Sequence, residues 1–186
     1  MLTLKPILNV VGVMLLACGI LMFTSIPFAL YYQTGNALPI FNAGIITVGV
    51  GALCRYYKYK EKTDVMKKEG YMTVALGWLA MIMFGTLPYL FTGEIPNFGN
   101  AVFEVASGVT TTGSTILTDI EGMTKDMLYW RSLTQWIGGM GVIVLTVAVF
   151  PYLGLGGVDL FSAEAPGPTS DKIHPRIQET AKVLWL

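Results

Sequence analysis

Residues 107–115 are the part of the chain whose residue types could coordinate a cation. The stretch is rich in small and hydroxyl side chains and lies between long apolar segments. In lipid, a non-helical backbone is tolerated only where protein buries it or where it lines a water-filled path. Such a backbone can turn its carbonyls toward an ion and replace the ion's water shell. We interpret Thr110, Thr111, Thr112 and Gly113 as ligands for a metal cation in one arm of a selectivity filter.

The alternative interpretation of this stretch is a polar turn that binds no ion. Three features favour the filter. Residues 100–109 read as a helix of about 15 Å, which can enter a bilayer but not cross it, and its carbonyl end carries partial negative charge that favours a cation. A full apolar span follows the stretch. Gly113 can take a positive φ and turn a carbonyl inward without a Cβ clash.

The composition identifies an integral membrane protein. Of the 186 residues, 53% are hydrophobic and 13% are charged, whereas soluble domains carry about a quarter charged residues. The net charge is zero, so no nucleic-acid partner is indicated.

Cys18 and Cys54 have no metal-site spacing and read as buried apolar residues. Residues 15–19 resemble a lipoprotein cleavage box, but the apolar sequence continues beyond them, which favours a spanning helix.

Four apolar segments predict spanning helices, at residues 7–32, 39–57, 70–91 and 127–150. With the short helix and the loop after it, the fold class is an all-α membrane protein with four spanning helices, one re-entrant pore helix and a filter loop. Pro27 is expected to kink the first span, and Asn97 or Asn100 to cap the pore helix. We divide the chain into two leading helices with a basic loop (1–69), a helix–pore helix–filter–helix repeat (70–150), and a cytoplasmic segment with the start of a further helix (151–186).

The basic residues predict the orientation. An amino terminus in the cytoplasm places 10 of the 12 Lys and Arg residues on that side, as the positive-inside rule requires. The outer loops then carry four acidic residues, which either raise the local cation concentration or are ordinary solvated charges: Glu94, Asp119, Glu121 and Asp126.

A single filter arm cannot surround an ion, so about four such units must meet around an axis. The chain contains one. We therefore expect either a homo-oligomer or further pore repeats in a longer chain.

Several segments of the sequence resemble a known family. The span–pore–span layout, residues 103–115, residues 135–145 and the tail segments 163–168 and 175–182 are similar to the TrkH potassium-uptake subunits of the Trk/Ktr/HKT superfamily. The resemblance implies two leading helices and the first of four pore repeats, with potassium as the transported ion and no organic cofactor. It also implies a bacterial inner membrane location and a TrkA-like cytoplasmic nucleotide-binding ring as partner.

Further candidate sites are Arg131, residues 138–141 and His174. Arg131 either pairs with Glu104 or extends to the membrane interface. Residues 138–141 are glycine-rich but follow no strand, so we expect helix packing and not a dinucleotide loop. His174, the only histidine, reads as a surface residue, and no catalytic constellation is present, so we expect no enzyme. The alternative function is a non-conducting module that docks a cytoplasmic partner through residues 55–68 and 154–180.

Overall fold

The computed structural model describes residues 4–56 and 67–149, and every regular element in these two ranges is an α-helix. The predicted basic loop and the segment 151–186, with His174, fall largely or wholly outside them. The helices have these bounds: α1 Leu4–Phe23, α2 Ile26–Tyr31, α3 Ala37–Tyr56, α4 Lys67–Gly85, α5 Leu87–Thr92, α6 Phe98–Val109 and α7 Lys125–Val149. The chain forms two compact units, residues 1–138 and 139–186, and the packing below lies within the first.

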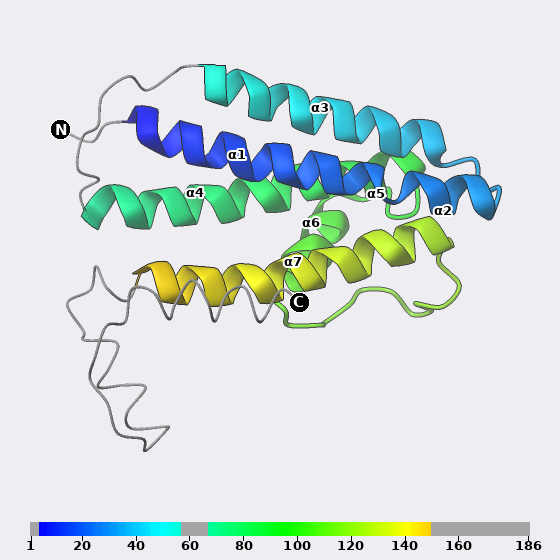
Figure 1. Cartoon of the computed structure of the whole chain (residues 1–186). Helices are drawn as coiled ribbons and strands as arrows, with labels where there is room; N and C mark the ends of the chain where they lie inside the picture. The colour runs from blue at the N-terminus through cyan, green and yellow to red at the C-terminus, as the bar shows by residue number, and fades with distance from the viewer. Residues whose placement is uncertain (1–3, 57–66, 150–186) are drawn as a thin grey trace, which may run out of the picture. The chain divides into compact units, whose positions relative to one another are not determined.

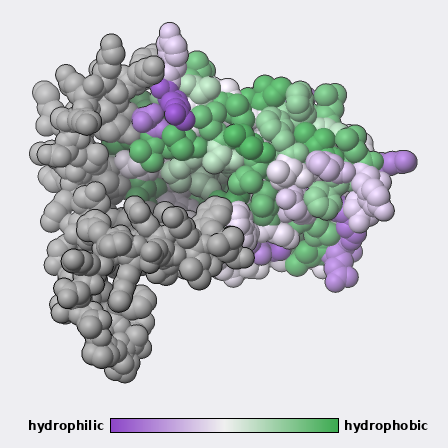
Figure 2. All heavy atoms as spheres, viewed as in Figure 1, coloured by the Kyte–Doolittle hydropathy of each residue, from purple (hydrophilic) through white to green (hydrophobic). Residues whose placement is uncertain are grey.

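Three stretches of the described chain are long and apolar enough to cross a membrane: Ile7–Tyr31, Ala37–Tyr56 and Met72–Thr92. They correspond to the first three predicted spans. The helix α7 has 25 residues, or about 37 Å, so it has the length for a fourth span, which stays a prediction. Figure 2 shows hydrophobic residues over much of the visible face, as expected of a surface in contact with lipid.

Proline divides two of the predicted spans. The first is interrupted at Thr24 and Ser25, with Pro27 in the first turn of α2, so the expected kink is confirmed. The third, predicted as a span over 70–91, is interrupted at Thr86, ahead of Pro88 in α5. Proline lacks an amide donor, and its ring clashes with the preceding turn, so the third span consists of two helical segments.

The leading helices α1 and α3 pack at glycine positions. A Cβ placed on Gly51 would lie 2.9 Å from the carbonyl oxygen of Gly12, and one placed on Gly44 would overlap the ring of Phe23. Such close backbone approach is typical of helix pairs in membranes. Gly49, in contrast, faces open space. Of the three glycines on α3, two therefore serve the close contact.

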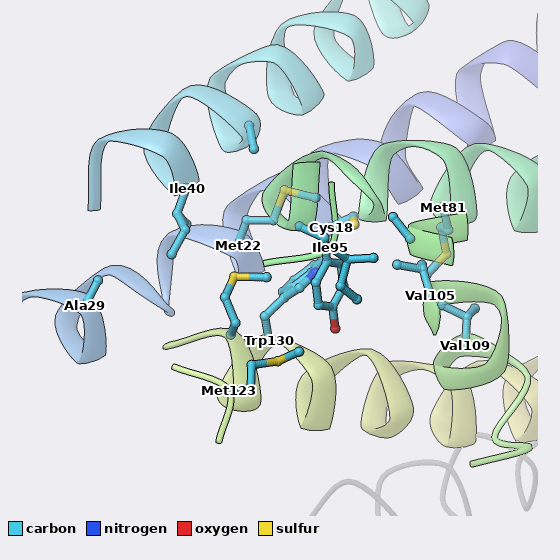
Figure 3. Packing of buried hydrophobic residues seen from close by; sticks show 14 residues of the cluster. Cys18, Met22, Ala29, Ile40, Met81, Ile95, Val105, Val109, Met123 and Trp130 are labelled. Carbon is cyan, nitrogen blue, oxygen red and sulfur yellow. The ribbon is translucent and has the colours of Figure 1, made fainter. Parts of the chain in front are cut away.

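One apolar core joins the leading helices to the pore repeat (Figure 3). Trp130 of α7 is 1% exposed. The side chains packed in this core include Met22 of α1, Val105 of α6 and Ile95 in the loop before α6. The Trp130 indole nitrogen donates to the carbonyl of Gly85 at 3.1 Å. Because the last carbonyls of a helix lack intrahelical partners, this bond supports the broken end of α4.

Candidate functional site

The pore helix α6 has 12 residues, Phe98–Val109, and begins two residues before the predicted position. Its N-cap is Asn97, whose side-chain oxygen accepts from the Asn100 amide at 3.1 Å. This settles the two alternatives in favour of Asn97. The length is about 18 Å, so the prediction of a helix that enters a bilayer without crossing it is consistent with the structure.

The segment after α6 leaves helical geometry at two residues. Thr111 has φ +56° and Gly113 has φ +75°. The glycine takes this conformation without a Cβ penalty, whereas a left-handed threonine is uncommon and strained. Residues 110–114 are all exposed on this chain.

The amides of this loop point back to the pore helix. The Thr111 amide donates to the Gly108 carbonyl at 2.9 Å, and the amides of Thr112 and Gly113 donate to the Ser107 carbonyl at 3.0 Å and 3.5 Å. No peptide bond of the described chain is cis. In a trans peptide the carbonyl points opposite to the following amide, so the carbonyls of residues 110, 111 and 112 are directed away from the helix.

The threonine hydroxyls bond within the loop or to the end of α6. The Thr110 hydroxyl donates to the Ala106 carbonyl at 2.7 Å and lies 2.8 Å from the Thr112 hydroxyl. The Thr111 hydroxyl donates to the Thr110 carbonyl at 2.7 Å. Of the three carbonyls directed outward, those of Thr111 and Thr112 are therefore better placed for an external ligand than that of Thr110.

Glu104 stabilises the C-terminal end of the loop. This side chain is buried, and its carboxylate accepts from the Thr115 hydroxyl at 2.8 Å, the Ile116 amide at 3.2 Å and the Arg131 Nε at 2.7 Å. The predicted alternative in which Arg131 pairs with Glu104 is thus confirmed. A buried charge requires such partners, and here they tie the loop to both α6 and α7.

The helix α7 approaches the end of the pore helix at a glycine. A Cβ on Gly138 would overlap the Val109 carbonyl oxygen, so only glycine permits this contact. The prediction that the glycine-rich stretch serves helix packing is confirmed at this position.

Three of the four acidic residues predicted for the outer loops accept hydrogen bonds within the chain. The Asp119 carboxylate accepts from the Gly122 amide at 3.0 Å. Asp126 is 0% exposed and accepts from the Asn36 side-chain amide at 3.0 Å. The Glu94 carboxylate accepts from the Thr124 amide at 3.4 Å. For Asp126, the expectation of solvated or cation-attracting loop charge was wrong, because this carboxylate is buried in the chain. Glu94 is half-buried and Asp119 is exposed, so for these two the expectation stays a prediction. Sequence reasoning missed the Asn36–Asp126 contact, which joins residues 90 positions apart and has no local signal.

Known proteins are similar to this chain over nearly its whole length. The family model described as "TrkH: Cation transport protein" matches residues 37–186. The Trk system potassium uptake proteins TrkH of Halomonas elongata and Vibrio parahaemolyticus are 40% and 38% identical over 98% and 97% of this chain, and the chain spans 38% of each.

A solved structure agrees with these matches. The crystal structure of the potassium transporter TrkH from Vibrio parahaemolyticus superposes with a TM-score of 0.80 at 33% identity. The match covers 99% of this chain and 36% of that one. These relatives are transporters and not enzymes, in agreement with the sequence. The fold, the family model and the relatives together show that this chain belongs to the TrkH family of cation transport proteins.

Proposed function

We propose that the chain supplies two leading helices and one filter arm of a TrkH-type potassium transporter. In this proposal the backbone carbonyls of Thr110, Thr111, Thr112 and Gly113 contribute ligands to potassium, which is the cargo. The observation that supports it most directly is the loop itself, where the amides of residues 111–113 bond back to the pore helix and the carbonyls of residues 110–112 face outward. Carbonyl oxygens held in this way can replace the water shell of a cation.

The remaining arms would come from further pore repeats or from other copies, because one arm cannot surround an ion. The protein would lie in the bacterial inner membrane with its amino terminus in the cytoplasm. A TrkA-like nucleotide-binding ring would dock on the cytoplasmic side. The relatives' printed names, which describe potassium uptake, support the choice of cargo.

The test replaces Gly113 by serine in the assembled transporter. A Cβ at φ +75° costs about 1–2 kcal/mol, so the loop should shift and its carbonyls should lose their positions. We expect potassium preference over sodium to fall about tenfold in a rubidium and sodium flux assay. The matched control is Gly93→Ser, because Gly93 also has a positive φ of 77° and open space around it, but lies outside the loop.

Unchanged selectivity in Gly113→Ser, with the control also unchanged, would contradict the filter assignment. The mass of the purified chain in nanodiscs, with and without potassium, tests how the arms are completed. A potassium-stabilised tetramer would indicate that four copies form the pore. A monomer indifferent to potassium would indicate that the other arms belong to a longer chain.

A further inference from the structure

The turn between α2 and α3 contacts the start of α7 through a polar cluster that the proposed function does not use. The Asn36 side-chain amide donates to Asp126 at 3.0 Å and to the Thr124 hydroxyl at 3.3 Å. We call Asn36, Thr124 and Asp126 the clasp. In Figure 1 this turn and the first residues of α7 lie at the same end of the helices. The clasp therefore joins the leading helices to the pore repeat by directed bonds.

The same end carries two further contacts between these parts. The rings of Phe28 and Tyr129 stack with centroids 4.4 Å apart, and the Tyr129 hydroxyl donates to the Thr24 hydroxyl at 3.2 Å. The clasp differs from them because Asp126 is fully buried. A buried carboxylate that loses its donor pays the desolvation cost of the unpaired charge. Asn36 is thus the contact whose loss would most disturb the first turn of α7.

From the clasp, a short length of helix leads to the filter loop. Arg131 lies five residues after Asp126, about 7.5 Å along α7. It donates to Glu104, which in turn holds Thr115 and Ile116 at the end of the loop. An α-helix transmits a displacement over this distance because its backbone is internally bonded.

We propose that Asn36 is a positioning residue for the filter loop. It fixes Asp126 and so the first turns of α7, which place Arg131 for Glu104. The leading helices would then help to set the geometry of the loop and would not act as a membrane anchor alone. Calling the loop a filter rests on the proposed function; the coupling between Asn36 and the loop does not.

The test is hydrogen–deuterium exchange on the assembled transporter in nanodiscs, with potassium and without it. The variant Asn36→Asp places a carboxylate against Asp126. We expect exchange within residues 112–116 to rise about tenfold, while α1 and α3 stay unchanged. The amides of Thr112 and Gly113 are bonded to α6, and the amide of Ile116 is bonded to Glu104. The control Gln33→Glu makes the same amide-to-carboxylate change at an exposed position of the turn that contains Asn36 and should have no effect.

The double variant Asn36→Asp with Asp126→Asn restores an amide–carboxylate pair with the roles exchanged. It should return the exchange rate to within about twofold of the parent. If Asn36→Asp does not accumulate, Asn36→Ser removes the amide donor without adding charge and gives the same comparison. Unchanged exchange at residues 112–116, an equal rise throughout α1 and α3, or no recovery in the double variant would each overturn the proposal. If potassium fails to slow exchange in the parent loop of the assembled transporter, the proposed function fails while the coupling result still stands.

Discussion

The interactions that stabilise the leading helices differ from those that stabilise the loop after α6. In α1 and α3, glycines let two backbones approach so closely that a Cβ on Gly51 would lie 2.9 Å from Gly12. In the pore repeat, the loop after α6 is held by hydrogen bonds to a buried carboxylate and to helix carbonyls. The difference follows from the backbone. Two regular helices satisfy their own polar groups and need only close packing, whereas an irregular loop at membrane depth needs a directed partner for each group that faces the protein.

The largest effect is expected where the pore repeat loses its buried charge. Glu104→Gln keeps the shape of the side chain but leaves Arg131 without its counter-ion, and the carboxyl side chain it replaces has 0% exposure. Removing one partner of a buried pair costs about 3–5 kcal/mol. We expect a corresponding loss of stability in thermal unfolding in detergent.

The control for this variant is Glu121→Gln, because Glu121 is exposed. The double variant Glu104→Gln with Arg131→Gln should recover part of the loss, since a neutral pair leaves no buried charge uncompensated. If Glu104→Gln and Glu121→Gln unfold at the same temperature, the loop does not depend on the carboxylate.

A smaller effect is expected in the leading helices. Gly51→Ala adds a methyl group against Gly12 and Leu16 of α1, and overpacking of this kind costs about 1–3 kcal/mol. Gly49→Ala on the same helix meets nothing within 4 Å and should stabilise the helix slightly, because alanine is the better helix former. Comparison of the two by thermal unfolding separates close packing from helix propensity. Equal effects would show that the glycines contribute no specific contact.

The smallest effect is expected at the start of the pore helix. Asn97→Ala removes the side-chain oxygen that accepts from the Asn100 amide, and loss of an N-cap costs about 1 kcal/mol. Asn100→Ala leaves that backbone bond in place and is the matched control. A difference between the two variants of less than a few tenths of a kcal/mol in unfolding would argue against the cap.

Local signals in the sequence predicted the elements around the loop. Apolar length predicted the spans, and the short run before the threonines predicted α6. The break at Thr86 was missed although Pro88 was a visible signal, because the apolar run on both sides suggested continuity. The sequence predicts the Glu104–Arg131 pair as one of two alternatives for Arg131, because a charge inside a span needs a partner. It predicts helix packing at Gly138, because a glycine permits close approach.

Contacts between distant segments could not be predicted in this way. Nothing in the local pattern relates Asn36 to Asp126, or Trp130 to the carbonyl of Gly85, because these pairs exist only once the helices have packed. The outward direction of the Thr111 and Thr112 carbonyls was likewise beyond reach, because it depends on where the loop amides find acceptors.

The exposure of the loop has a consequence for the order of assembly in the membrane. Residues 110–114 are exposed on this chain, and a backbone polar group left unsatisfied in hydrocarbon costs several kcal/mol. With the loop at membrane depth, as we propose, a newly inserted segment therefore cannot wait in contact with lipid. Either water must accompany the loop into the bilayer, or neighbouring segments must cover it during insertion. The timing of biogenesis would thus be set by the same carbonyls that we propose as ligands for the ion.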